Sequence, residues 1–87
     1  MKLPTIKSVK ALENYNLLVE FSNQEYRLYN MTPLLSKEMF VPLKNPALFK
    51  KVRVDVGGYA VTWNEEIDLS EYELWNHGKP IFSMPSA

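Results

Sequence analysis

Alternation of apolar and polar residues between positions 17 and 29 predicts a first β-hairpin. A period of two places one set of side chains on a buried face and the other set in water. If Asn23-Gln24 forms a two-residue turn, Phe21 lies opposite Tyr26 and both belong to the same face. Glutamine does not favour the positive φ of a type I′ turn, so a wider loop over residues 22–25 remains an alternative. The residues expected on the buried face are Leu17, Val19, Phe21, Tyr26 and Leu28.

A second and clearer hairpin is predicted between residues 52 and 63, where large apolar residues alternate with polar or small ones on both sides of Gly57-Gly58. Glycine adopts positive φ without steric cost, so this pair supplies both central positions of a type I′ turn. The turn sets the register, and six large apolar side chains then share one face, which we assign to the core. The predicted cross-strand pairs are Val56 with Tyr59, Val54 with Val61, and Val52 with Trp63.

The segments around the two hairpins complete a small α+β fold. Residues 5–12 predict one further strand, followed by a loop at 13–16. Residues 31–51 hold three prolines, which disfavour a long helix or a central strand but suit the first turn of short helical pieces at 33–35 and 46–49. The expected fold therefore has about five short antiparallel strands in hairpins, short helical turns in the middle and one short C-terminal helix.

The stretch between positions 62 and 75 carries five carboxylates, and most of them have a structural explanation. Ser70 and Glu73 have the spacing of a capping box, in which each side chain bonds the backbone N–H of the other residue. Leu69 and Leu74 have the spacing of a hydrophobic staple around the same helix start. We therefore interpret the stretch as a strand giving way to a helix.

The C-terminal end of this helix is predicted at Gly78, which we expect in the left-handed conformation, with Pro80 preventing extension of the helix. Residues 1–79 are expected to form a single α+β domain, because a chain of 87 residues supports one hydrophobic core. Residues 80–87 are expected to form a flexible C-terminal tail.

Composition narrows the class of protein without identifying a site. The chain has no cysteine, which excludes disulfides, thiol catalysis and zinc–cysteine or iron–sulfur sites, and which suits a reducing cytoplasm. The first residues lack the apolar core of a signal peptide, and no apolar run is long enough to cross a bilayer. Ten basic residues balance ten acidic ones, so this domain alone lacks the basic excess typical of nucleic-acid binders. We expect a soluble, cytoplasmic protein that does not bind membranes.

The charges are unevenly distributed along the chain. Residues 37–53 contain five basic residues and one acidic residue, whereas residues 64–77 contain five acidic residues and no lysine or arginine. Complementary patches of this kind steer protein association, so we expect a non-enzymatic protein-interaction or regulatory module that binds another protein or a second copy of itself. The alternative is that the two segments face each other within one molecule or are simply solvated. The candidate partner contacts are Glu65, Glu66, Asp68, Lys50, Lys51 and Arg53.

An enzyme is a second hypothesis. A small hydrolase-like or metal-assisted enzyme would use the acidic turn 65–73 together with His77, the single histidine. It requires that His77 lie in a pocket, within hydrogen-bond reach of an acid such as Glu66 or Asp68. The sequence motifs assign no catalytic, cofactor-binding or metal-ligating residue, and no cofactor is expected.

An accessory nucleic-acid-binding module is a further alternative. It would use exposed aromatic residues for stacking, and the aromatic residues expected outside the core are Tyr15 and Tyr29. It would also need one face that gathers the basic residues Lys2, Lys7, Lys10, Lys44, Lys50, Lys51 and Arg53.

Three segments in a fixed order carry a resemblance to a known family: LLVEFSNQEYRLYNMTPLL, then PLKNPALFKKVRVDVGGYAVTW, then IDLSEYELW. Their most specific parts are the Asn45-Pro46 step before Phe49, Trp63, and Asp68-Leu69 leading to Leu74. In these the chain resembles the domain-of-unknown-function family numbered 2442, a group of small, mostly bacterial proteins. The resemblance implies a small α+β fold in a bacterial cytoplasm, and it brings no activity or catalytic residue with it. Some relatives carry an additional DNA-binding domain, and some are encoded beside another small protein.

The chain departs from the pattern of this family at two turns. Members often have Asp-Gly in the first hairpin turn, where this chain has Asn23-Gln24. They often have proline and glycine after the tryptophan, where this chain has Asn64-Glu65-Glu66. Both departures affect loop geometry more than the fold.

Overall fold

The computed structural model describes residues 3–82 and confirms an α+β fold. Within these residues the strands are β1 (Ile6–Leu12), β2 (Asn16–Phe21), β3 (Tyr26–Asn30), β4 (Arg53–Val54), β5 (Ala60–Thr62), β6 (Asp68–Ser70) and β7 (Lys79–Ile81). The α-helices are α1 (Pro46–Phe49) and α2 (Glu71–His77). Short 3₁₀ turns are η1 (Glu13–Tyr15), η2 (Thr32–Leu34), η3 (Glu38–Lys44) and η4 (Val56–Gly58). The strands β6 and β7 were not predicted, because three residues are too few to show an alternating pattern.

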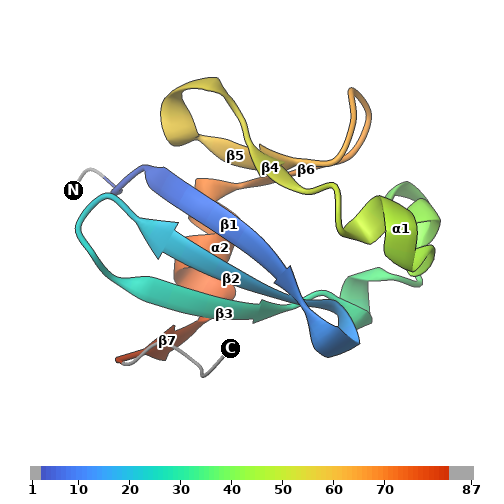
Figure 1. Ribbon diagram of the computed structural model, residues 1–87, viewed down its shortest axis with the longest axis horizontal. Helices are drawn as coiled ribbons and strands as arrows, with labels where there is room; N and C mark the ends of the chain where they lie inside the picture. Colours follow the sequence, from blue (N-terminus) through green and yellow to red (C-terminus); the bar gives the residue numbers. More distant parts are fainter. Residues whose placement is uncertain (1–2, 83–87) are drawn as a thin grey trace.

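The strands form two antiparallel sheets (Figure 1). The four-stranded sheet has the order β1-β2-β3-β7, and the three-stranded sheet has the order β4-β5-β6. Helix α2 lies behind the four-stranded sheet in the view of Figure 1 and covers what we call its inner face. The outer face is turned toward the viewer. The two sheets meet where β4 runs beside β1 (Figure 1).

The β2–β3 hairpin has a loop of residues 22–24, wider than the two-residue turn and within the alternative predicted over residues 22–25. The Gln24 N–H donates to the Phe21 carbonyl, and the Phe21 N–H donates to the Glu25 carbonyl, each at 2.9 Å. Three residues therefore form the loop, and Gln24 takes the left-handed conformation with φ 71°. A three-residue hairpin loop commonly needs one residue in this conformation.

The wider loop shifts the register of this hairpin by one residue from the expected one. Tyr26 pairs with Glu20, and Leu28 pairs with Leu18. A one-residue shift moves every side chain of a strand to the opposite face. The prediction that Tyr26 and Leu28 lie on the buried face is therefore wrong, since both lie on the outer face. The inner positions of β3 are taken by Arg27 and Tyr29.

The β4–β5 hairpin has the predicted register but not the predicted two-residue turn. The Gly58 N–H donates to the Asp55 carbonyl at 3.0 Å and the Asp55 N–H donates to the Ala60 carbonyl at 2.9 Å, so the loop comprises residues 56–59 and the predicted pair of Val56 with Tyr59 is not formed. Gly57 and Gly58 have φ of 87° and 77°, respectively. Val54 pairs with Val61 as expected. Lengthening the predicted turn by one residue on each side leaves the register unchanged.

The tip of this hairpin is not part of the core, contrary to the prediction. Val56 is 93% exposed and Tyr59 is 61% exposed. Gly58 packs on the start of β1 so closely that a Cβ there would lie 2.6 Å from the Ile6 carbonyl oxygen.

The middle of the chain contains the short helical pieces that its prolines predict. Turn η2 and helix α1 correspond to the predicted pieces at 33–35 and 46–49. Asn45 caps α1, because its side-chain oxygen accepts from the Ala47 N–H at 3.0 Å. Turn η3, which contains Pro42, was not predicted.

The core lies between the inner face, α2 and the three-stranded sheet, and the middle segment closes one end of it. Phe21 packs edge-on against Trp75 with 5.0 Å between ring centroids. The Trp63 Nε1–H donates to the Phe49 carbonyl at 3.0 Å, which satisfies the one polar group of this buried ring. The core residues are Ile6, Leu17, Val19, Phe21, Tyr29, Met31, Leu35, Phe40, Leu43, Phe49, Val61, Trp63, Ile67, Leu69 and Leu74.

The region after α2 corrects two predictions. Gly78 has an extended backbone, with φ −74° and ψ 153°, and not the left-handed conformation. Glycine is required here because the Cβ of any other residue would lie only 2.9 Å from the Cβ of Arg27 on β3, which is too close. The next residues form β7, in which Pro80 pairs with Arg27. Residues 80 and 81, expected in a tail, therefore belong to the sheet, whereas residues 83–87 lie outside the described residues.

Candidate functional site

The acidic turn between β5 and β6 is built by Asn64. The Asn64 side-chain oxygen accepts from the N–H groups of Glu66 at 2.8 Å and Ile67 at 2.9 Å. The Thr62 hydroxyl donates to the Asn64 carbonyl at 2.7 Å. An asparagine that bonds its own following backbone is a common turn device. The side chains of Glu65 and Glu66 are exposed and do not hold the turn together.

The start of α2 shows half of the predicted capping box. The Ser70 hydroxyl accepts from the Glu73 N–H at 3.2 Å. The Glu73 carboxylate does not return to Ser70, and instead accepts from the Tyr29 hydroxyl at 2.7 Å. Leu69 and Leu74 are both buried, as the staple spacing predicts.

Tyr29 is buried on the inner face, so the prediction that it is exposed is wrong. Burial raises the pKa of Tyr29 above its ordinary value, and the hydrogen bond to Glu73 and the negative charge of that carboxylate raise it further. All three effects disfavour the phenolate. The Tyr29–Glu73 pair thus joins β3 to α2.

His77 does not join the acids of the turn. Its Nε2 lies 3.9 Å from Oε1 of Glu73, one helical turn earlier, and the side chain is exposed at the helix end. The grouping of His77 with Glu66 or Asp68 that the enzyme hypothesis requires is therefore not formed. Among residues 3–82, no group of three or more histidines and carboxylates is placed to hold a metal ion.

The six predicted partner contacts are all exposed, but only some of them lie close together. Arg53 pairs with Thr62, and Thr62 pairs with Asp68, so the three form one row across the three-stranded sheet. Two strand spacings place Arg53 and Asp68 about 10 Å apart. The remaining contacts lie on adjoining segments: Lys50 and Lys51 follow α1, while Glu65 and Glu66 lie in the β5–β6 turn.

The basic and acidic segments form no ion pair with each other in the described part of the chain. Its salt bridges are Lys7–Glu20, Arg27–Glu25 and His77–Glu73. The charges of the six predicted partner contacts therefore remain open to solvent or to a partner.

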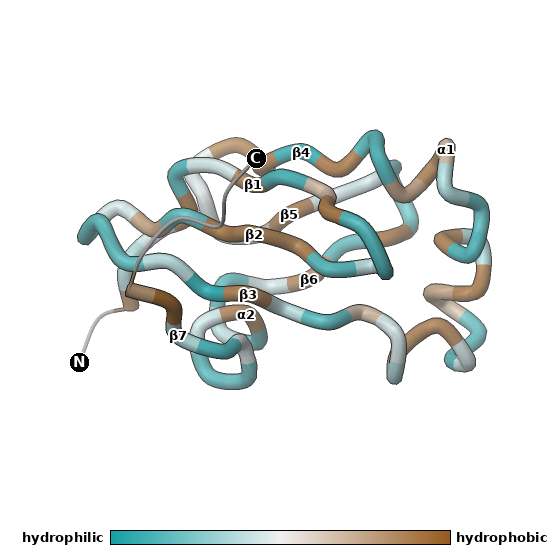
Figure 2. Tube along the Cα trace, turned by 60° about the horizontal axis from the view of Figure 1, so that its bottom comes forward, coloured by the Kyte–Doolittle hydropathy of each residue, from teal (hydrophilic) through white to brown (hydrophobic). Residues whose placement is uncertain are grey.

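A different feature, missed from the sequence, lies on the outer face of the four-stranded sheet. One row across all four strands reads Lys10, Leu18, Leu28, Lys79. Leu18 is only 6% exposed, yet it does not belong to the core cluster, because its neighbours Leu17 and Val19 face the core instead. Strand β2 is accordingly hydrophobic along most of its length (Figure 2).

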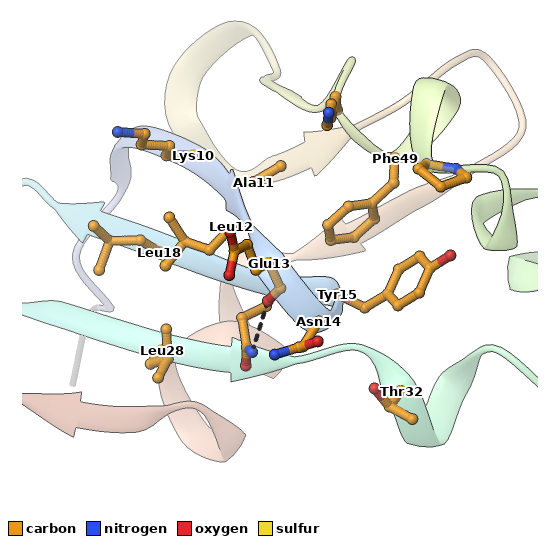
Figure 3. Close-up of a pocket in the computed structure, with 13 residues that line it drawn as sticks. Lys10, Ala11, Leu12, Glu13, Asn14, Tyr15, Leu18, Leu28, Thr32 and Phe49 are labelled. Atoms are coloured by element: carbon orange, nitrogen blue, oxygen red, sulfur yellow. Dashed lines mark hydrogen bonds between the residues drawn. The ribbon is translucent and has the colours of Figure 1, made fainter. Parts of the chain in front are cut away.

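A groove of about 1010 Å³ opens beside this apolar pair and continues around the end of the β1–β2 hairpin to α1 (Figure 3). Leu12, Leu18 and Leu28 lie along its sheet side, and Tyr15 and Phe49 lie at its other end (Figure 3). Ligand-binding clefts in proteins typically measure roughly 300–1,000 Å³, so the groove is large enough to be one. Lys10 and Lys50 also line it.

The wall of the groove at the hairpin turn is held in an unusual backbone conformation. Asn14 and Tyr15 both have φ of 61°, which is rare for a bulky residue such as tyrosine. The Tyr15 hydroxyl donates to the Lys44 carbonyl, and its ring packs edge-on against Phe49 at 5.1 Å. These contacts offset a conformational cost on the order of 1–3 kcal/mol.

The face required for nucleic-acid binding is only partly assembled. Lys10 and Lys50 border the same groove, whereas Lys7 is engaged by Glu20 at 3.6 Å. Lys2 lies outside the described residues.

These features define a small α+β protein with two antiparallel sheets and an apolar surface on the outer side of the larger one. The chain belongs to the family described as "Protein of unknown function (DUF2442)", whose family model matches residues 6–80. This confirms the resemblance seen in the sequence. Comparison with curated proteins finds no match, and comparison with solved structures finds none either. No helix in residues 3–82 is long and apolar enough to cross a membrane.

Proposed function

We propose that this protein is a non-enzymatic interaction module that binds another protein through the outer face of its four-stranded sheet. The observation that carries the proposal is the pair Leu18–Leu28 at the centre of that face. An antiparallel sheet with one face on the core ordinarily presents polar residues on the other face. Apolar residues on both faces are typical of a sheet that is covered on both sides. No helix or strand of residues 3–82 lies over the outer face (Figure 1).

The size of the face indicates a transient complex. Four strands span about 14 Å across the sheet, and five residues span about 17 Å along it. The area that these two lengths enclose is well below the roughly 800 Å² per partner that a stable interface buries. The adjoining groove extends the contact area around the end of β1.

The exposed charges support fast association with such a partner. We propose that Lys50, Lys51, Arg53, Glu65, Glu66 and Asp68 steer the encounter, because they carry no ion pair with one another in the described residues. Exposed charges act mainly on the association rate and are screened by salt. A reducing cytoplasm is the proposed setting, since the sequence contains no cysteine that oxidation could modify.

Affinity capture from an extract of the native host tests the proposal. Leu28→Asp places a charge in the centre of the outer face. Val56→Asp is the matched control, because it makes the same kind of change at an exposed apolar residue on the hairpin tip. We expect one set of proteins to be retained by the wild type and by Val56→Asp at ~50 mM salt, and to be lost with Leu28→Asp. Retention should weaken at ~500 mM salt, where exposed charges are screened.

Two results would contradict the proposal. One is that no protein is retained specifically at either salt concentration. The other is that Leu28→Asp, shown by circular dichroism to be folded, retains the same proteins as the wild type. Sedimentation of the purified protein distinguishes the other partner class, since a second copy bound through this face would make the wild type heavier than Leu28→Asp.

A further inference from the structure

The row of four residues across the outer face is wide enough for one helix to lie between its two ends. Lys10 and Lys79 lie at its two ends, and Leu18 and Leu28 lie between them. Three strand spacings place the two lysine backbones about 14 Å apart. An α-helix with its side chains is about 10–12 Å wide. A helix lying along the strands would therefore contact the half-buried Leu28 directly, lie over the nearly buried Leu18, and leave its two flanks beside the lysines.

The surface between the lysines is apolar and hollowed at both ends. Leu12 on β1 extends the leucine pair toward the large groove, which all three leucines line. At the other end a second hollow of about 280 Å³ is lined by Tyr26 and Ile81, which pair across β3 and β7, and also by the polar residues Gln24, Glu25 and Arg27. Apolar anchor residues of a bound helix have room in the large groove at one end of this stripe.

The positive charges of the outer face favour a partner that carries acidic residues. Lys10 and Lys79 are exposed, and neither takes part in a salt bridge among residues 3–82. Glu20, the acidic residue of the neighbouring row, is already engaged by Lys7 at 3.6 Å and by the Ser8 hydroxyl at 3.1 Å. The charges on this face that lack an ion partner are therefore the two lysines, and carboxylates are their complement.

The sheet edges disfavour the other common mode, in which an extended peptide adds a strand. One edge, β1, already runs beside β4 (Figure 1). The other edge, β7, has three residues, and one of them is Pro80, which has no N–H to donate. A helix laid on the open face needs neither edge.

We infer that the outer face binds an amphipathic helix of the partner protein, with an apolar stripe on Leu18 and Leu28 and Asp or Glu residues on both flanks opposite Lys10 and Lys79. The inference rests on the proposed protein-binding function and names the chemistry of the partner. Helices that dock by an apolar face are recognised through side chains at positions i, i+3, i+4 and i+7, and charges beside them set the specificity.

A designed peptide tests the inference directly. The probe is a fluorescein-labelled helix of about 18 residues with leucines at the i, i+3, i+4 and i+7 positions and glutamates on both flanks. The control peptide has lysines in place of those glutamates. Fluorescence anisotropy with the full chain should show saturable binding of the acidic peptide and at least tenfold weaker binding of the basic one. Backbone amide NMR shifts should map the acidic peptide to β1, β2, β3 and β7.

Charge-reversal variants give a matched comparison. Lys10→Glu/Lys79→Glu should weaken binding of the acidic peptide at least tenfold and strengthen binding of the basic peptide. Lys37→Glu/Lys44→Glu changes the net charge by the same amount at exposed positions around η3, and it should alter affinity by less than threefold. Equal loss in both variants would show that only net charge matters, and it would overturn the inference.

The remaining outcomes are also informative. Failure of the acidic peptide to bind, or NMR shifts confined to the three-stranded sheet, would overturn the inference. Binding that occurs only after removal of residues 83–87 would overturn it in favour of the chain's own segment as occupant. If the peptide fails while capture from the extract still depends on Leu28, the helical partner is wrong and the proposed function stands. If capture does not depend on Leu28, the proposed function itself fails.

Discussion

The two faces of the four-stranded sheet are both apolar, but they differ in how their polar groups are held. On the inner face, Arg27 is only 7% exposed, and its guanidinium carbon lies 3.8 Å from the ring centroid of Trp75. Its Nε also donates to the Trp75 carbonyl at 3.3 Å. On the outer face, Lys10 is exposed and has no ion partner among residues 3–82. Apolar content alone therefore does not distinguish a core from a binding surface. What distinguishes them is whether the polar groups beside the apolar residues have partners within the protein.

The largest expected contrast between the faces is in packing. Phe21→Ala on the inner face should lower the free energy of unfolding by ~3–5 kcal/mol, because Phe21 is fully buried and contacts Trp75. Tyr26→Ala on the outer face removes a ring of similar size and should cost less than half as much. Urea denaturation of both variants measures the difference. Equal costs would mean that the outer face is part of the core.

The next contrast concerns two tyrosines of the same strand. Tyr29→Phe should cost ~1–3 kcal/mol near neutral pH, because it removes the hydroxyl that donates to the Glu73 carboxylate. Tyr26→Phe should stay within about 0.5 kcal/mol.

The cost of Tyr29→Phe should also depend on pH. The raised pKa of Tyr29 means that the folded state holds this proton more tightly than the unfolded chain does. Its contribution is complete below the unfolded pKa of about 10 and is lost as pH rises above that value. Denaturant titrations from pH 8 to pH 11 should therefore show the difference between wild type and Tyr29→Phe shrinking. A constant difference would contradict the assigned burial.

Ser70 extends the comparison to the three-stranded sheet. It is exposed on β6, yet Ser70→Ala should cost ~1 kcal/mol, because the Glu73 N–H at the start of α2 loses its acceptor. Ser36→Ala, at another exposed position, is the control and should stay within about 0.5 kcal/mol. Thermal melts of the two variants suffice, and a neutral Ser70→Ala would remove the capping interpretation of the acidic stretch.

The smallest effect is expected in the acidic turn. Glu66→Gln should change stability by no more than about 0.5 kcal/mol, because Asn64 holds the turn and the Glu66 side chain is exposed. A clear gain in stability would instead indicate carboxylates kept close together at a cost, as functional sites often require. Chemical denaturation resolves a change of this size when wild type and variant are compared side by side.

The two hairpins show how far sequence reasoning reaches. The register of β4–β5 could be predicted, because Gly57 and Gly58, which both take positive φ, mark the centre of the loop even though the loop has four residues. The register of β2–β3 could not, because Asn23-Gln24 permits more than one loop. The structure resolves it by placing Gln24 alone at positive φ. One residue of loop length decided which face of β3 meets the core.

The same uncertainty in the β2–β3 register prevented prediction of the candidate site from the sequence. The outer face depends on pairing Leu18 with Leu28, which the expected register does not do. It also depends on β7, whose three residues leave no periodic signal. The groove joins Tyr15 to Phe49, which are distant in sequence and meet only through tertiary packing. The exposure of the six charged contacts was predictable, because charged residues seldom lie buried without partners.

Strand β7 also bears on the tendency of the protein to aggregate. Free sheet edges are templates on which other chains can assemble into extended β-structure. Here the edge is three residues long, carries a lysine at its start and has a proline in the middle. Proline is tolerated on edge strands because its nitrogen can face away from the neighbouring strand, where a further strand would seek a donor. The four-stranded sheet thus ends in an element that completes β3 while offering little to an unrelated chain.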